Sequence, residues 1–184
     1  MSTLTAKTHY GNLSPEFAVL GLLYGGPMHG YDLHKKLVSD LGQVWHLSQS
    51  QAYAILKRLE GQGYVAAEEI PQEKLPPRQY LHLTANGRER FLAWLEASSG
   101  GSTRAIRMEF ITRLYFLSLY MPEKLAPAFV RQRADAEFHI QRLEAIRAAL
   151  PTEQIHNRMS LELRILQLRS VLAWLDQKYQ EPTK

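Results

Sequence analysis

The feature that most constrains this chain is the order of patterns between Ser14 and Thr84. Three helical segments are followed by two strand-like runs that are joined by a Pro-rich turn. A unit of this kind presents one outward helix whose diameter fits a DNA groove, with a hairpin beside it. The order of elements therefore predicts a surface that can contact a duplex.

Capping and breaking residues delimit the first two helices. The first begins at residues 14–16. Ser14 can cap the helix, Pro15 suits the first helical position, and the negative charge of Glu16 is favourable at the positive end of the helix dipole. It stops at the Gly-Gly-Pro of 25–27. The second begins near Gly30 or Tyr31. Its buried stripe has four-residue spacing and consists of Leu33, Leu37 and Leu41.

The third helix has a clear division between an apolar and an exposed face. It starts from Ser48 or Ser50, and its apolar residues at i, i+3, i+4 and i+7 are Ala52, Ile55, Leu56 and Leu59. Steps of about 100° per residue place small, polar and basic side chains on the other side. These are Ser50, Ala54 and Lys57, flanked by Gln51, Tyr53 and Arg58. They are available to contact another molecule.

Two strands, 64–70 and 79–83, are predicted after the third helix, with prolines stiffening the connection between them. A fourth helix follows Thr84. The small residues of 98–103 are the expected linker between a winged-helix domain at 1–97 and a helical domain at 104–184. The predicted fold class is mainly α, with an N-terminal winged helix-turn-helix (three helices, β-hairpin wing) and a C-terminal antiparallel helical dimerisation domain.

The last helix, from Thr152 to about Tyr179, is apolar on more than one side. A row at heptad spacing is predicted to form the dimer contact and consists of Leu161, Ile165, Leu168, Leu172, Leu175 and Tyr179. A second row consists of Met159, Leu163 and Leu166. A single neighbouring helix cannot cover both rows, so the surplus face predicts a homodimer.

Composition argues against several kinds of site. Without cysteine there is no disulfide, thiolate zinc site or Cys nucleophile. The seven histidines come without an HExxH pattern, and the chain has no G-x-S-x-G elbow or phosphate-binding loop. We therefore expect no metal, no cofactor and no enzymatic activity. No signal segment and no apolar run of roughly 20 residues is found, which predicts a cytoplasmic protein without a membrane partner.

Net charge does not identify the N-terminal half as a DNA-binding surface. Residues 1–103 hold nine Lys/Arg and nine Asp/Glu, so the net charge of +4 lies in residues 104–184. This neutrality leaves an alternative open, in which the winged helix is a protein-protein interaction module without sequence-specific DNA binding. A DNA contact would depend on the placement of individual cations.

Over roughly residues 13–95 the sequence resembles the PadR family of bacterial winged-helix transcription regulators. The motifs are Leu20-Gly21-Leu22-Leu23 before a Gly-Pro stop, His29-Gly30-Tyr31-Asp32-Leu33, Tyr53-Ala54-Ile55-Leu56-Lys57-Arg58-Leu59-Glu60 followed by Gly63, and Arg78-Gln79-Tyr80-Leu81-His82-Leu83-Thr84 with Gly87 and Arg88. The resemblance implies a dimeric regulator, mostly a repressor, that binds an inverted-repeat operator in double-stranded DNA. Some members are released by a small aromatic effector.

Candidate DNA contacts follow from the exposed face of the third helix. Lys57 and Arg58 are expected at phosphates, Ser50 and Gln51 at base edges, and Ala54 at a thymine methyl. Ordinary solvated side chains are the alternative for the two cations. Further candidates are Tyr53, which can also simply pack, Tyr31 and His29 at the start of the second helix, and Lys74 and Arg78 on the wing. Wing glutamates offer those last two an internal salt-bridge ladder instead.

Four aromatic residues are the candidates for an effector-binding site: Phe91, Trp94, Phe110 and Tyr115. The family resemblance suggests this role, whereas aromatic residues at helical spacing more often form plain core. Both interpretations stay open at the level of sequence.

Overall fold

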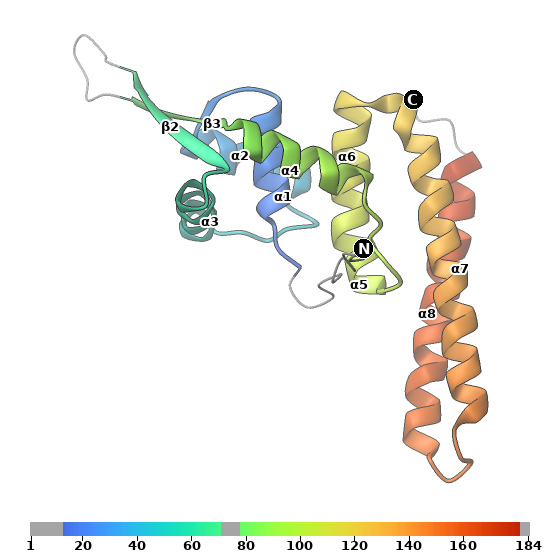
Figure 1. Cartoon of the computed structure of the whole chain (residues 1–184). Coiled ribbons are helices and arrows are strands. Elements are labelled where there is room, and N and C mark those ends of the chain that lie inside the picture. The colour runs from blue at the N-terminus through green and yellow to red at the C-terminus, as the bar shows by residue number, and fades with distance from the viewer. Residues whose placement is uncertain (1–12, 71–77, 181–184) are drawn as a thin grey trace, which may run out of the picture. The chain divides into compact units, whose positions relative to one another are not determined.

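The computed structural model describes residues 13–70 and 78–180 (Figure 1). The chain divides into two compact units, Met1–Gly87 and Arg88–Lys184. Most of the helix that follows the hairpin is thereby grouped with the second unit. The predicted linker at 98–103 stays a prediction, because the division into compact units does not test it.

Three helices form the core of the N-terminal unit: α1 (Glu16–Tyr24), α2 (Gly30–Leu41) and α3 (Gln49–Gly61). Their predicted apolar stripes are buried, with Leu33, Leu37 and Leu59 fully inaccessible to solvent. At the start of α1, Ser14 Oγ accepts a hydrogen bond from the Glu16 N–H at 3.4 Å. The three predicted helices are confirmed, and so are the apolar stripes predicted for α2 and α3, whereas α1 is buried on nearly all sides.

A three-stranded antiparallel sheet with the order β1-β3-β2 completes the winged helix. Strands β2 (Val65–Ile70) and β3 (Arg78–Leu83) form the predicted hairpin. The short strand β1 (Met28–His29) pairs with β3 and was not predicted, because two residues are too few to show a strand period. It ties the segment between α1 and α2 to the wing.

The exit from the hairpin explains the spacing of Thr84 and Gly87. Thr84 Oγ1 accepts the Gly87 N–H at 3.1 Å, and the Thr84 hydroxyl donates to the Gly63 carbonyl at 2.7 Å. A Cβ on Gly87 would lie 2.0 Å from the Tyr64 carbonyl oxygen. Only glycine therefore fits where helix α4 (Ala85–Glu96) begins against the start of the hairpin.

The C-terminal unit is helical. After α4 the chain forms α5 (Thr103–Ala105), a π-helical turn η1 (Ile106–Phe110) and α6 (Ile111–Tyr120), which follow one another without a break. A 3₁₀ turn, η2 (Pro122–Lys124), leads into α7. The π-helical turn was not predicted, because its residues keep a helical pattern.

Two long helices end the described chain, α7 (Leu125–Ala149) and α8 (Ile155–Gln180). They lie side by side as an antiparallel hairpin along most of their length (Figure 1). No helix in the described ranges is long and apolar enough to span a bilayer. The expected fold class, a winged helix followed by a helical region, is confirmed.

Candidate nucleic-acid interface

A complete capping box fixes the start of α3. Ser48 Oγ accepts the Gln51 N–H at 3.3 Å, and Gln51 Oε1 accepts the Ser48 N–H at 2.9 Å. Of the two predicted start points, Ser48 is the cap, and Ser50 lies in the first helical turn with its hydroxyl 3.0 Å from Ser48 Oγ. Two backbone donors are thus satisfied at the end of the helix that carries the candidate contacts.

The box restricts the role predicted for Gln51. A bidentate pair with adenine requires both the amide oxygen and the amide nitrogen of a glutamine. Here the oxygen already accepts a backbone hydrogen bond. Gln51 can still donate through its nitrogen, but a bidentate contact would break the cap, which is typically worth ~1 kcal/mol.

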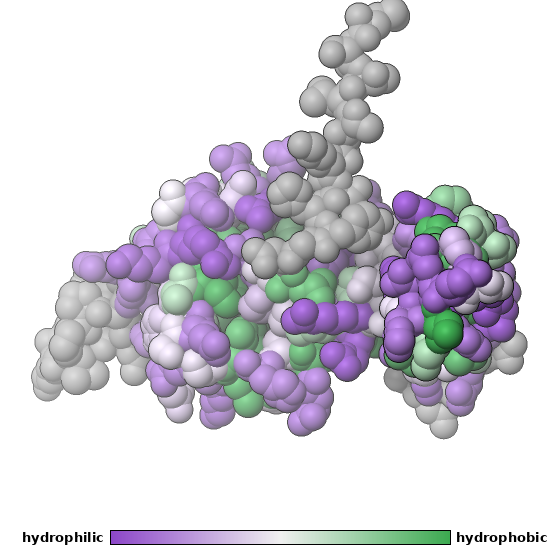
Figure 2. Space-filling view, turned by 90° about the horizontal axis from the view of Figure 1, so that it is seen from below, coloured by the Kyte–Doolittle hydropathy of each residue, from purple (hydrophilic) through white to green (hydrophobic). Residues whose placement is uncertain are grey.

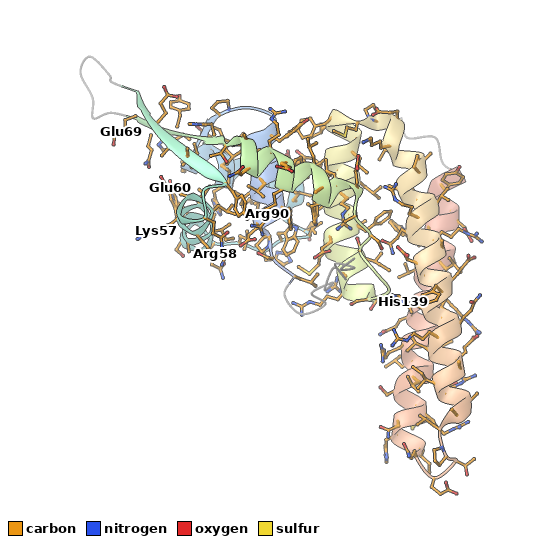
Figure 3. All side chains as sticks on the ribbon, viewed as in Figure 1. Lys57, Arg58, Glu60, Glu69, Arg90 and His139 are labelled. Atoms are coloured by element: carbon orange, nitrogen blue, oxygen red, sulfur yellow. The ribbon has the colours of Figure 1, made fainter. Side chains whose placement is uncertain are left out.

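The remaining candidates on α3 lie on its open side. Ser50, Ala54 and Lys57 are exposed, whereas Ala52, Ile55, Leu56 and Leu59 are buried. Figure 3 shows Lys57 projecting away from α1 and α2. Among the residues that the structure describes, Lys57 makes no ion pair. Its charge is therefore available to an external anion.

Arg58 forms an ion pair with Glu16, a residue that was not predicted to be part of the site. Its Nη2 lies 2.7 Å from Glu16 Oε1, while half of the Arg58 side chain stays exposed. Glu16 itself is almost buried at the start of α1. The pair orients the guanidinium at the edge of α3 and neutralises part of its charge. Glu16 was predicted only as a favourable residue for the helix end.

The start of α2 lies next to α3 through Tyr53. A Cβ on Gly30 would approach Tyr53 Cε1 to 2.9 Å, so the tyrosine ring rests against this glycine. Tyr53 is 41% exposed and Tyr31 54% exposed. His29 caps α2, since its Nδ1 accepts the Tyr31 N–H at 3.2 Å. The structure thus joins Tyr53, Tyr31 and His29 at one edge of the α3 face.

The predicted wing contacts are only partly within the described chain. Lys74 lies outside the described residues. The backbone of Arg78 pairs with Ile70 at the outer end of the hairpin, but its side chain is not described. Glu68 and Glu69 face Tyr80 and Gln79 across the hairpin. The wing cations stay a prediction.

The four candidate effector residues lie in the C-terminal unit as core or near-core. Phe91, Trp94 and Phe110 are buried, and Tyr115 is half-buried. Phe91 packs edge-to-face on Phe116 with 5.3 Å between ring centroids. Phe110 lines a cavity of only about 10 Å³, which is too small for an aromatic ligand. The burial of Phe91, Trp94 and Phe110 favours the core interpretation for these three rings in this conformation.

Arg113 is the charged centre of this aromatic core. Its guanidinium carbon lies 4.6 Å from the centroid of the Trp94 ring, and its Nε donates to the Trp94 carbonyl at 2.8 Å. Further contacts go to Ser99 and to Glu109 at 3.6 Å. Burial lowers the pKa of Arg113 to about 10, while burial also raises the pKa of Glu109. No sequence pattern predicted this buried cation.

Four of the six residues in the predicted dimer row are buried within the chain, Leu172 is half-buried and Tyr179 is exposed, and the role of the row in a dimer stays a prediction. Leu161, Ile165, Leu168 and Leu175 are buried within the chain, on the helix that packs along α7. The heptad row therefore closes the α7–α8 hairpin, because that hairpin already supplies a neighbouring helix. The second row remains exposed, with Met159, Leu163 and Leu166 each more than half accessible. Figure 2 shows apolar patches among polar residues on this hairpin.

Comparisons with known protein families match the N-terminal and C-terminal parts of the chain to two different families. A model described as "Transcriptional regulator PadR-like family" matches residues 19–93, and one described as "Virulence activator alpha C-term" matches residues 106–181. A curated relative, the negative transcriptional regulator PadR of Bacillus subtilis (strain 168), is 30% identical over 118 residues. The match covers 64% of this chain and 64% of that relative, which is less than two thirds of its length.

Solved structures of similar proteins include Bacillus subtilis PadR in complex with operator DNA. It is 22% identical, with a TM-score of 0.45, and the match covers 89% of this chain and 95% of that one. Protein smu.1604c from Streptococcus mutans UA159 is 17% identical with a TM-score of 0.45, covering 92% of this chain and all of that one. Bacillus subtilis PadR in complex with p-coumaric acid is 22% identical with a TM-score of 0.41, covering 90% and 93%.

Proposed function

Through its N-terminal domain this chain belongs to the PadR-like family of transcriptional regulators, and we propose that it represses genes by binding an inverted-repeat operator as a dimer. Its relative in Bacillus subtilis is a negative transcriptional regulator, which supports the repressor role. The single observation that carries the proposal is the α3 face. It combines a rigid capped start, small exposed side chains and a cation without an ion-pair partner in the described chain.

Each side chain of that face has a role in the proposed complex. Lys57 and Arg58 contact phosphates and supply affinity, and the Glu16 pair fixes the direction of the Arg58 guanidinium. Ser50 reads a base edge, Ala54 meets a thymine methyl, and Gln51 donates from its amide nitrogen. With so few base contacts, part of the specificity comes from DNA shape.

The edge formed by α2 adds backbone-directed contacts. Tyr53 and Tyr31 present hydroxyl groups that can donate to phosphate oxygens. His29 contributes by holding the first turn of α2, whose backbone N–H groups favour a nearby anion. Lys74 and Arg78 of the wing are proposed to reach an adjacent part of the backbone.

Dimerisation is proposed to use the exposed row of α8. Ile155, Met159, Leu163 and Leu166 recur at spacings of four, four and three residues, and each is more than half exposed. A stripe of this kind can pack against the same stripe of a second copy in a two-fold contact. The two α3 helices would then enter major grooves about one turn, roughly 10 base pairs, apart or a small multiple of it.

A small aromatic ligand is proposed to release the DNA. One relative's structure is described as a complex with p-coumaric acid. A ligand that favours one separation of the two reading helices changes operator affinity, because a dimer with misplaced helices loses one half-site. Phe91, Trp94 and Phe110 are buried and would contact a ligand only after a rearrangement of the core, whereas Tyr115 is half-buried.

The decisive experiment measures binding to DNA from upstream of the protein's own gene across a salt series. We expect specific binding whose affinity falls steeply with salt. Lys57→Ala should weaken it and reduce the log-log salt slope by about 1.8, because each subunit of the dimer loses one phosphate contact worth about 0.9. Arg164→Ala on α8 removes the same charge outside the N-terminal domain and should have no effect.

Two outcomes would contradict this proposal. Absent or salt-insensitive binding would favour the alternative, a winged helix that binds protein without sequence-specific DNA contacts. Equal losses in Lys57→Ala and Arg164→Ala would show that only the net charge of the protein matters, and not the α3 face.

A further inference from the structure

The turn between α2 and α3 sets the point at which α3, the reading helix, begins. It spans residues 42–48, and the last of these caps α3. The Val44 and Trp45 N–H groups both donate to the Leu41 carbonyl, at 2.9 and 2.8 Å. Trp45 is only 4% exposed, so it holds the middle of the turn in the core. This anchor fixes the turn before the cap, but not at the cap itself.

A side chain of α2 provides a second anchor that lies closer to α3. His34 is half-buried, and its Nε2 lies 2.9 Å from the carbonyl oxygen of Leu47. A carbonyl oxygen only accepts hydrogen bonds, so Nε2 carries the proton and His34 donates. Leu47 comes immediately before the Ser48 cap. The bond therefore joins two positions 13 residues apart and holds the backbone where α3 begins.

The anchored carbonyl directly precedes the capping box of α3. Ser48 and Gln51 exchange two hydrogen bonds, and the Ala52 N–H donates to the Ser48 carbonyl at 3.0 Å. A displacement of the Ser48 backbone would therefore move the whole first turn, including the exposed Ser50. Side chains that recognise a ligand have to be held within about 0.5 Å of their working positions. The His34 bond thus acts on the base-reading end of α3 from outside that end.

The same turn contains a histidine without such a bond. His46 is exposed, and among the residues that the structure describes its side chain forms no hydrogen bond. The two histidines share their chemistry and differ in their contacts. His46 therefore serves as the matched control for His34.

We propose that His34 is a positioning residue of the reading helix, which holds the start of α3 through its hydrogen bond to Leu47 and does not itself contact DNA. Base contacts require an exact helix position, whereas a long, flexible lysine side chain follows a phosphate through small shifts. The bond therefore supports sequence specificity more than general DNA affinity. This consequence for specificity rests on the proposed function, but the fixed start of α3 does not.

Amide hydrogen exchange in the free, full-length protein tests the positioning role. The side chain of Asn is too short to reach the Nε2 position of His34, whereas Gln can place an N–H group there. We expect the Ala52 amide to exchange about fivefold faster in His34→Asn, the factor of one lost hydrogen bond. His34→Gln should restore the exchange rate to within about twofold of the wild type. The Leu56 amide, further along α3, is the internal reference and should be unchanged.

Three outcomes of the exchange measurement overturn the positioning role. Unchanged exchange at Ala52 in His34→Asn would mean that the bond does not hold the start of α3. Equal acceleration at Ala52 and Leu56 would mean that the variant only lowers the overall stability. A failure of His34→Gln to restore the rate would mean that the hydrogen bond is not responsible.

Fluorescence anisotropy with two DNA fragments tests the effect on specificity. One fragment comes from upstream of the protein's own gene, and the other has the same composition in scrambled order. His34→Asn should weaken operator binding about fivefold for each half-site, and thus about 25-fold for a dimer, but change binding to scrambled DNA less than about twofold. His34→Gln should restore operator binding, and His46→Asn should change neither affinity. Equal losses on the two fragments, or an equal loss in His46→Asn, would overturn the specificity role.

The two measurements separate this inference from the proposed function. Faster exchange at Ala52 in His34→Asn of a protein that does not bind DNA leaves the positioning role assigned and removes the repressor proposal. Specific operator binding with unchanged Ala52 exchange and unchanged affinity in His34→Asn does the reverse.

Discussion

Helices α3 and α8 are both amphipathic, but the number of their apolar faces differs. On α3 a single apolar stripe is buried, so the exposed residues follow directly from the sequence. On α8 two apolar rows compete, and only one is buried within the chain. A one-sided helix therefore reveals its functional face in its sequence, whereas a two-sided helix requires knowledge of its neighbour.

The largest expected effect tests the two rows of α8. Leu168→Ala removes a fully buried side chain and should lower the free energy of unfolding by about 2–5 kcal/mol. Leu163→Ala, on the exposed row, should leave a dilute protein nearly as stable as the wild type while weakening self-association. Urea unfolding at low protein concentration, together with analytical ultracentrifugation, separates the two quantities. The reverse pattern would return the dimer contact to the heptad row.

The contact between Gly30 and Tyr53 gives an intermediate effect in the N-terminal unit. A methyl group on Gly30 would lie 2.9 Å from the Tyr53 ring and push it aside. Gly30→Ala should therefore weaken operator binding about tenfold, or about 1.4 kcal/mol, if Tyr53 contacts a phosphate. Its stability should change by less than about 1 kcal/mol, because alanine favours a helix.

A double-mutant cycle supplies the control for this prediction. Tyr53→Ala should lose the same affinity, and adding Gly30→Ala to it should cost nothing further. Fluorescence anisotropy with labelled operator measures all four proteins. Additive losses would mean that Gly30 affects DNA binding by a route that does not include Tyr53.

The smallest expected effect concerns the pair of Glu16 and Arg58. Glu16→Gln removes the carboxylate that neutralises Arg58, so binding to non-specific DNA should tighten a few-fold at low salt. Glu60→Gln makes the same change of charge on α3, at an exposed residue with no ion pair in the described chain. Binding should respond more strongly to Glu16→Gln than to Glu60→Gln in the same anisotropy assay, and equal responses would argue against the pair.

Local signals accounted for most of the N-terminal fold. Capping serines, glycine stops and the stripe of Leu33, Leu37 and Leu41 lie within one helix or its ends, so their effect is visible in a short window. The same holds for the exposed positions of Ser50, Ala54 and Lys57. Contacts between distant residues were missed, as with Glu16 and Arg58, because nothing in either segment indicates the other.

In the C-terminal unit, contacts between distant residues decided more of the structure than local signals did. Its helices were predicted, but the buried Arg113 and the π-helical turn were not, since both depend on how the chain packs around them. Which of the two apolar rows of α8 is buried also depends on packing, because α7 covers one row and leaves the other exposed.

By itself, the sequence determined the kinds of elements, their order and the open face of α3, because hydrophobic period and capping chemistry act over a few residues. Only the tertiary structure decided which row of α8 is buried and which carboxylate holds Arg58. These outcomes depend on side chains that are distant in the chain, whose proximity is set by packing rather than by local preference.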